Sequence, residues 1–366
     1  MFHNTYINKK VLITGHTGFK GSWLTSWLLK LGAVVVGISK DIPTQPAMFE
    51  ELDLGNQIKS HQIDIRDLEG IKKIIKQERP DFIFHLAAQA IVSLSYSDPV
   101  ETISSNVVGT MNILEALRFV DHECIAVLIT SDKCYDNVEW IWGYRESDSL
   151  GGKDIYSGSK GAAELIIKSY LNSFFRKENV PVRIGIGRAG NVIGGGDWAK
   201  DRLVVDCVSS WANDSVVEIR SPMATRPWQH VLEPLSGYLT LGQSLKLDHK
   251  HHAEAFNFGP RSEQNRTVKD LISDMSNYWL RNEKKALFNI TDNIPFHEAN
   301  LLRLNCDKSL QCLKWESNLG YDETVEMVCE WYFSYYHKTE DIKLLTNLQI
   351  DKYESIGLHR GRAWSV

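Results

Sequence analysis

Five residues near the middle of the chain have the types and spacing of a proton-transfer centre. They are Ser131, Asp132, Lys133, Tyr156 and Lys160. The first three follow residues 125–130, an apolar, β-branched run typical of a buried parallel strand, whose end would face a ligand crevice. Tyr156 and Lys160 stand at positions i and i+4 of a helical stretch and so share one helix face. Because a nearby cation lowers the pKa of a phenol, we expect Tyr156 to accept a proton from a sugar hydroxyl.

A glycine-rich turn near the start of the chain has the spacing of a dinucleotide-binding site. It lies between a predicted strand at 11–14 and a predicted helix at 22–31, and its glycines follow the pattern G-x-x-G-x-x-G. Glycines allow a tight turn and close approach to a pyrophosphate, and the helix N-terminus offers free N–H groups. The cofactor contacts predicted in this turn are Gly15, Thr17, Gly18, Phe19, Lys20 and Gly21.

Further cofactor contacts are expected after the next strands. Asp41 follows a predicted strand at 33–38, where a carboxylate can accept both ribose hydroxyls and would repel a 2′-phosphate, so NAD is favoured over NADP. Asp64, in a predicted strand at 61–64, is placed to reach the adenine amino group. A small-residue turn after the strand at 82–86 can lie against the phosphates and ribose. The other predicted contacts are Ile65, Leu86, Ala87, Ala88, Gln89 and Asn106, with Tyr156 and Lys160.

The order of the predicted elements indicates the fold class. Strands alternate with helices as far as a strand at 182–187, which is typical of a doubly wound parallel sheet of the Rossmann type. We therefore predict an α/β protein with an NAD-binding domain and a smaller mixed α/β substrate domain at the C-terminal end. The predicted boundaries are 1–190 with a returning segment at about 227–262 for the first domain, and 191–226 with 263–366 for the second.

Composition excludes several classes of function. The chain has 366 residues and a formal net charge of −5, which gives no electrostatic reason to expect nucleic acid or an anionic membrane as partner. Its six cysteines show no metal-ligand spacing, and the histidines at 249–252 are expected in a solvated loop, so we predict no metal site. The polar N-terminus and the lack of a long apolar run favour a soluble cytoplasmic protein.

The chain resembles the extended short-chain dehydrogenases/reductases over nearly its whole length. The glycine turn, the strand-end serine and the Tyr156/Lys160 pair carry this resemblance. Residues 130–135 are similar to the active-site strand of nucleotide-sugar 4,6-dehydratases, most of which have Asp-Glu where this chain has Asp132-Lys133. That departure, with the stretches 15–23, 190–198 and 226–231, resembles the branch acting on CDP-glucose. The resemblance implies CDP-glucose as substrate, and no residue physically dictates the choice of base.

The resemblance implies a reaction in which water is lost from a nucleotide-linked glucose to give a 4-keto-6-deoxy sugar. Tyr156 would remove the 4-hydroxyl proton while NAD takes the C-4 hydride and later returns it to C-6. Ser131 would hydrogen-bond the 4-oxygen, and Lys160 would hold the nicotinamide ribose. Asp132 would protonate the departing 6-hydroxyl. For Lys133 two roles stay open: the base that removes the C-5 proton, or a charge that stabilises the enolate.

Substrate contacts and partners complete the predictions. The residues expected to bind the substrate's diphosphate are Asn191, Arg202, Arg226 and Arg303. Family usage implies a homodimer or homotetramer. The alternatives are a 4,6-dehydratase for another nucleotide sugar, a 4-epimerase, which would leave Asp132 and Lys133 without a role, and a non-catalytic NAD-binding sensor.

Overall fold

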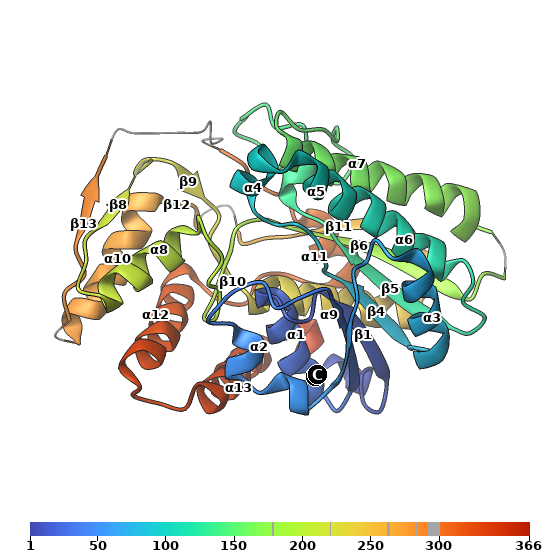
Figure 1. Ribbon diagram of the computed structural model, residues 1–366, viewed down its shortest axis with the longest axis horizontal. Helices are drawn as coiled ribbons and strands as arrows, with labels where there is room; N and C mark the ends of the chain where they lie inside the picture. The colour runs from blue at the N-terminus through green and yellow to red at the C-terminus, as the bar shows by residue number, and fades with distance from the viewer. Residues whose placement is uncertain (178, 220, 262–263, 283, 292–300) are drawn as a thin grey trace.

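A seven-stranded parallel sheet forms the centre of the computed structural model (Figure 1). The structure describes residues 1–177, 179–219, 221–261, 264–282, 284–291 and 301–366. The strand order reverses between β1 and β4, as in doubly wound nucleotide-binding sheets, which confirms the predicted fold class. In sheet order the strands are β11 (Ala255–Phe258), β6 (Val182–Ala189), β5 (Cys124–Ile129), β4 (Phe82–His85), β1 (Lys10–Thr14), β2 (Val34–Ser39) and β3 (Lys59–Gln62).

Helices cover both faces of this sheet because its buried strands are apolar on both sides. In β1, Val11 and Ile13 point into one core and Leu12 into the other. The helices α1 (Phe19–Lys30) and α9 (Leu232–Leu247) pack on the first face. The opposite face is covered by α3 (Leu68–Glu78), α6 (Gly109–Leu117) and α7 (Ile155–Tyr170).

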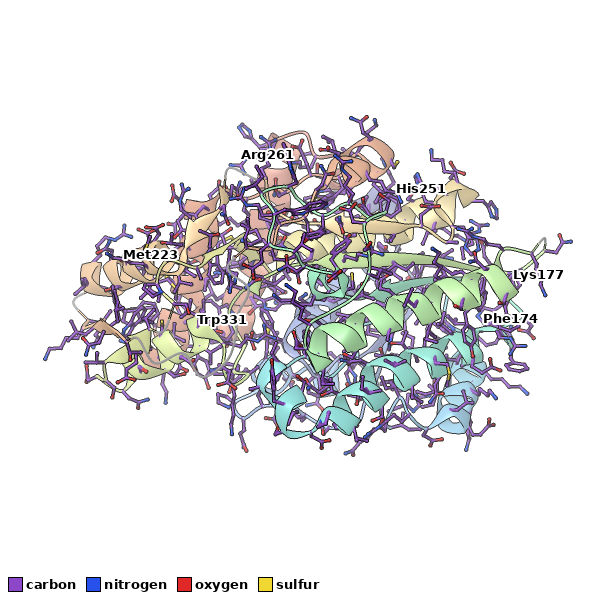
Figure 2. The ribbon with its side chains drawn as sticks, turned by 90° about the horizontal axis from the view of Figure 1, so that it is seen from above. Phe174, Lys177, Met223, His251, Arg261 and Trp331 are labelled. Atoms are coloured by element: carbon purple, nitrogen blue, oxygen red, sulfur yellow. The ribbon has the colours of Figure 1, made fainter. Side chains whose placement is uncertain are left out.

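A smaller lobe stands beside the sheet. Two short strand pairs belong to it: β8 (Val217–Ile219) runs parallel to β13 (Phe288–Ile290), and β9 (Thr225–Arg226) runs antiparallel to β12 (Arg266–Thr267). In Figure 2 this lobe, which contains Met223, lies toward one end of the molecule, and Lys177 lies at the opposite end. Its helices are α8 (Leu203–Ala212), α10 (Val268–Arg281) and α12 (Tyr321–His337).

The C-terminal α-helix packs against the first α-helix of the chain. Helix α13 (Ile342–His359) packs against α1, and the Nε1 of Trp27 donates to Glu354 at 2.7 Å. The ring of Trp364 stacks on Phe2 with 5.5 Å between centroids. These large aromatic rings complete the core beneath α1, so the stretch assigned to the substrate domain extends back onto the nucleotide-binding part.

Two local predictions also differ from the structure. Strand β3 ends at Gln62, so Asp64 lies in the following loop. The loop of histidines contains a short 3₁₀ helix, His249–His251, in which His251 hydrogen-bonds Ser244 at 2.6 Å. Within the described ranges, no helix is long and apolar enough to cross a membrane, and no acidic, histidine or cysteine side chains gather as a metal site.

Candidate active site

A cavity of about 940 Å³ opens at the carboxyl ends of the sheet strands, where it meets the smaller lobe. This is the edge at which doubly wound sheets bind their ligands. The five predicted catalytic residues line it, as do all the predicted cofactor contacts except Asn106. Asn191, Arg202 and Arg226 also line it. Polar groups from distant parts of the sequence therefore converge on one space large enough for two nucleotides.

The glycine turn after β1 fits a dinucleotide pyrophosphate. Gly15 has φ +76°, and a Cβ there would lie 2.8 Å from the backbone nitrogen of Ala87. A Cβ on Gly21 would overlap the carbonyl oxygen of Gly15. Gly18 is the N-cap of α1 and no side chain caps that helix, so its first N–H groups face the cavity unshielded by protein side chains. The Thr17 hydroxyl donates to the carbonyl of Asp41 at 2.7 Å and ties the turn to the end of β2.

The two carboxylates predicted for the nucleoside end differ in their surroundings. Asp41 is exposed on the cavity wall. Its neighbour Lys40 donates to Glu101 at 3.0 Å, and the same ammonium lies 4.0 Å from the Asp41 carboxylate, so this cation is beside the expected ribose site. Asp64 is paired with Arg66, whose Nη2 lies 2.6 Å from a carboxylate oxygen, and the hydrogen bond from Arg66 lowers the pKa of Asp64.

Asn106 lies behind the cavity wall and does not line the cavity, and its contact with the cofactor stays a prediction. Its Oδ1 accepts from the backbone nitrogen of Gln89 at 2.8 Å, and its Nδ2 donates to Ser159 at 2.8 Å. Both ends of the amide are thereby used inside the protein. The residue fixes the turn after β4 against α7, and Gln89 itself lines the cavity.

Ser131, Asp132 and Tyr156 meet at the end of β5. Ser131 caps the short 3₁₀ helix Asp132–Cys134, and its hydroxyl donates to Asp132 at 2.9 Å and accepts from the backbone nitrogen of Lys133 at 3.2 Å. Ser131 lies near the Tyr156 phenol and lowers its pKa, which opposes the larger effect of burial. Tyr156 enters this site because Asp154 caps α7, accepting from the backbone nitrogen of Ser157 at 2.9 Å.

The electrostatics of Tyr156 differ from the prediction. Burial raises the pKa of Tyr156 to about 12, and the cation that opposes this most is Arg202 rather than Lys160. The ammonium of Lys160 lies 5.8 Å from the phenol ring centroid, and burial lowers its own pKa to about 8. The expected lowering of the Tyr156 pKa by Lys160 is therefore wrong for the protein alone, because desolvation of the phenol outweighs a cation at that distance.

Several further charges surround the catalytic residues. Lys133 lies half-buried on the cavity wall. Burial, followed by repulsion from Arg202, lowers the pKa of Lys20 to about 8, and Asp132 and Asp197 oppose this. Burial raises the pKa of Asp197. The site thus holds cations from the glycine turn, from α7 and from the smaller lobe close to two buried carboxylates.

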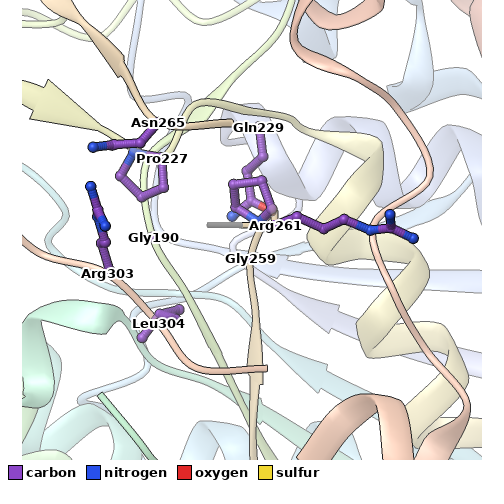
Figure 3. A pocket seen from close by; sticks show the side chains of 9 residues that line it. Gly190, Pro227, Gln229, Gly259, Arg261, Asn265, Arg303 and Leu304 are labelled. Carbon is purple, nitrogen blue, oxygen red and sulfur yellow. The ribbon is translucent and has the colours of Figure 1, made fainter. Parts of the chain in front are cut away.

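Arg303 lies beside this cavity rather than in its wall. It lines a small adjoining space of about 10 Å³ together with Gly190, Gln229 and Asn265 (Figure 3). With the Asn265 amide oxygen turned toward it, Arg303 donates through Nη2 at 2.7 Å, and the Asn265 nitrogen donates to the carbonyl of Arg226 at 3.1 Å. Asn265 therefore joins the segments that carry Arg226 and Arg303.

Sequence reasoning missed Asn265, Asp197 and Tyr135. Asp197 and Tyr135 both line the cavity and lie inside stretches that the sequence analysis singled out, 190–198 and 130–135. The sequence assigned them no role because no residue type near them in the chain indicated a partner for either side chain. Asn265 lies in no motif, and only the tertiary contact between strands β9 and β12 brings it to Arg226.

The fold and the site together define a Rossmann-type dinucleotide-binding protein with the serine, tyrosine and lysine arrangement of the extended short-chain dehydrogenases/reductases. The chain belongs to the GDP-mannose 4,6 dehydratase family, whose model matches residues 12–328. It is 45% identical over 356 residues to the CDP-glucose 4,6-dehydratase of Salmonella typhimurium, covering 96% of this chain and 98% of that one.

Solved structures share the fold. The UDP-glucuronic acid 4-epimerase of Bacillus cereus, in complex with UDP-glucuronic acid and NAD, matches with a TM-score of 0.76 at 21% identity, over 89% of this chain and 100% of its own. The dTDP-glucose 4,6-dehydratase of Bacillus anthracis, in complex with NAD, matches with a TM-score of 0.72 at 18% identity, over 89% of this chain and 97% of its own.

Proposed function

We propose that this protein converts CDP-glucose to CDP-4-keto-6-deoxyglucose with loss of water. The observation that carries the proposal is the convergence of Ser131, Asp132, Lys133 and Tyr156 on one cavity at the end of β5. An acid and a base next to a serine–tyrosine pair suit an elimination that follows oxidation at the neighbouring carbon. The near full-length similarity to the Salmonella typhimurium enzyme supports cytosine as the base of the nucleotide.

NAD is the proposed cofactor. When bound, it would supply the hydride acceptor and donor together with one positive charge. Gly15, Gly18 and the N-terminus of α1 would hold its pyrophosphate, and Asp41 would accept its ribose hydroxyls. Asp64 and Ile65 would flank the adenine, and the turn at Leu86–Gln89 would lie against the phosphates and ribose.

Tyr156 would remove the proton from the sugar's 4-hydroxyl. Ser131, which lines the same cavity, would donate to the 4-oxygen as the ketone forms. Because burial raises the pKa of the free phenol to about 12, the base requires more positive charge beside it than the protein alone provides. Lys160, on the same helix face, would orient the nicotinamide ribose.

Asp132 and Lys133 would carry out the elimination. Asp132, which is 4% exposed and lines the cavity, would protonate the departing 6-hydroxyl. Lys133 would take the C-5 proton, which the adjacent ketone makes acidic. The substrate diphosphate would be bound by Asn191, Arg202 and Arg226, with Arg303 reaching it from the adjoining space.

The setting of the enzyme is part of the same proposal. We infer a cytoplasmic enzyme that works as a homodimer or homotetramer and feeds deoxysugar synthesis for a bacterial O-antigen polysaccharide. Exposed apolar side chains on neighbouring helices support self-association, since water-facing apolar groups are stabilised by a second copy. They are Val100, Ile103, Val108 and Leu165.

Proton NMR of the purified protein with NAD and one nucleotide sugar at a time tests this function. The panel consists of CDP-, dTDP- and UDP-glucose and GDP-mannose. We expect a new sugar methyl signal with CDP-glucose, and we expect the other nucleotide sugars to form no methyl signal at a comparable rate. A methyl signal with another nucleotide would overturn the cytosine assignment, and inversion at C-4 without a methyl would make the enzyme an epimerase.

The cofactor assignment leads to a prediction for Asp41. Asp41→Asn is expected to weaken NAD⁺ binding about tenfold, the effect of removing a charged hydrogen-bond acceptor, and to narrow the preference over NADP⁺. Isothermal titration calorimetry with each dinucleotide measures both effects. Glu50→Gln, an exposed carboxylate on α2 (Met48–Glu51) outside the cavity, is the control. Unchanged NAD⁺ affinity in Asp41→Asn would contradict the assignment.

A further inference from the structure

A buried polar network lies directly behind the catalytic turn. Glu164, one helical turn after Lys160 on α7, accepts from the hydroxyl of Thr130 at 2.5 Å. The guanidinium of Arg188 on β6 donates to both oxygens of Glu164, at 2.8 and 2.9 Å. Glu164 and Arg188 are each 3% exposed. Because Thr130 immediately precedes Ser131, this ion pair fixes the end of β5 to α7 and β6.

The phenol of Tyr135 extends the network away from the ion pair. Its hydroxyl accepts from Nη1 of Arg188 at 2.7 Å and donates to Oδ1 of Asn257, on β11, at 2.7 Å. The Arg188 guanidinium also lies over the Tyr135 ring, 4.9 Å from its centroid. The Asn257 amide donates onward to the carbonyls of Tyr144 and Asn305, at 2.9 and 3.0 Å.

The network ends on the segment that carries Arg303. The backbone nitrogen of Tyr144 donates to the carbonyl of Arg303 at 2.9 Å, and that of Asn305 donates to the carbonyl of Tyr144 at 2.9 Å. The rings of Tyr135 and Tyr144 stack with 5.1 Å between centroids. Figure 3 shows the Arg303 side chain leaving this segment toward Asn265. A continuous chain of contacts therefore joins Arg303 to Thr130.

Substitutions in the network differ in how strongly they would disturb the fold. Taking either partner from the Glu164–Arg188 pair would leave a buried charge uncompensated and threaten the fold. Tyr135 is different, because Tyr135→Phe removes one hydroxyl and keeps the ring on Tyr144 and under Arg188. Its hydroxyl links the ion pair to the Asn257 side chain. A second link runs through Glu146, whose carbonyl accepts from Arg188 at 3.2 Å and whose carboxylate accepts from the backbone nitrogen of Asn257 at 2.8 Å.

We propose that Tyr135 is a positioning residue that makes the alignment of the catalytic turn depend on the nucleotide diphosphate held by Arg303. The proposal rests on the proposed function, which assigns the diphosphate to Arg303. Seating of the diphosphate would fix residues 301–305, and through Tyr144, Asn257 and Tyr135 it would hold the end of β5 in its reactive position. If the two residues act through one another in this way, the effects of substituting Tyr135 and Arg303 on activity are not additive.

A double-mutant cycle measures that coupling. Tyr135→Phe is expected to lower kcat/KM about tenfold in the wild-type background, the usual effect of losing a buried hydrogen bond to a charged group. In the Arg303→Met background the same substitution is expected to lower kcat/KM less than about twofold. The reason is that Arg303→Met has already removed the contact with the diphosphate on which the effect of Tyr135 depends. Equal factors in both backgrounds would overturn the coupling.

Tyr353→Phe is the matched control. This tyrosine is 0% exposed, and its hydroxyl lies 3.0 Å from Glu233 and 3.0 Å from Ser236, away from the cavity. It is expected to lower Tm as Tyr135→Phe does and to leave kcat/KM unchanged in both backgrounds. An activity loss in Tyr353→Phe equal to that in Tyr135→Phe would reduce the effect of Tyr135 to general stability and overturn its positioning role.

Hydrogen exchange with CDP gives a second measurement that does not need turnover. CDP is expected to slow amide exchange at residues 131–135 in the wild type and to leave it unchanged in Arg303→Met and in Tyr135→Phe. Protection in Tyr135→Phe equal to that in the wild type would overturn the proposal. The double-mutant cycle is run with whichever nucleotide sugar the wild type dehydrates. If that sugar carries a base other than cytosine, only the proposed substrate is overturned. If Tyr135→Phe lowers kcat/KM by the same factor in both backgrounds, only the coupling is overturned.

Discussion

Replacing Tyr156 with phenylalanine is expected to lower kcat about 1,000-fold, within the range that general acid–base groups contribute. The substitution removes the phenol oxygen and leaves the ring in its buried place on α7. Substrate affinity is expected to change little, because the diphosphate contacts are assigned to the arginines of the smaller lobe. Steady-state kinetics with CDP-glucose, with kcat and KM determined separately, measures the effect.

Tyr170→Phe provides the control on the same helix. Its hydroxyl donates to Glu115 at 3.3 Å at the far end of α7, outside the cavity. This variant is expected to keep the wild-type kcat. A Tyr156→Phe enzyme with more than about one tenth of the wild-type kcat would show that another group removes the 4-hydroxyl proton, since base removal costs at least about 100-fold.

Lys133 is expected to behave as a base, so that both Lys133→Met and Lys133→Arg lose about 100- to 10,000-fold in kcat. Methionine keeps the bulk of the side chain without the amine. Arginine keeps the positive charge, but a guanidinium stays protonated in proteins and cannot accept a proton. Exchange of the C-5 hydrogen with solvent deuterium, followed by NMR, is expected to stop in both variants.

The arginine variant separates the two roles that the sequence left open for Lys133. If Lys133 instead stabilises the enolate by its charge, Lys133→Arg keeps most of the activity while Lys133→Met loses it. That outcome would contradict the base assignment and keep the elimination mechanism. Lys153→Met, a second lysine on the cavity wall, tests whether any loss of positive charge there has the same effect.

The parts of the fold and site that follow a repeating physical rule were predictable from the sequence. Buried parallel strands are recognisable as apolar runs, and their carboxyl ends meet at one edge of the sheet. That rule is sufficient to bring the glycine turn after β1, Asp41 after β2 and Ser131 after β5 into one cavity. Helical spacing likewise places Tyr156 and Lys160 on one face of α7.

Features that depend on tertiary contacts were not predictable in this way. The pKa of Tyr156 is decided by burial, which a pair of residues four apart on a helix does not reveal. The hydrogen bonds of the Asn106 amide to Gln89 and Ser159 join segments that are distant in sequence. The junction of Arg226 and Arg303 through Asn265 joins three distant segments. The packing of the C-terminal helix on α1 rests on aromatic contacts between opposite ends of the chain.

An isotope crossover experiment tests the central claim that a single active site oxidises, dehydrates and reduces the same sugar. The substrate is an equal mixture of CDP-glucose carrying deuterium at C-4 and CDP-glucose whose sugar carries carbon-13 throughout. The account predicts a 4-keto-6-deoxy product in which deuterium appears in the methyl group of the molecules without carbon-13 and in no others. Deuterium in the carbon-13 product, its loss to solvent, or a product without a methyl group would contradict the account.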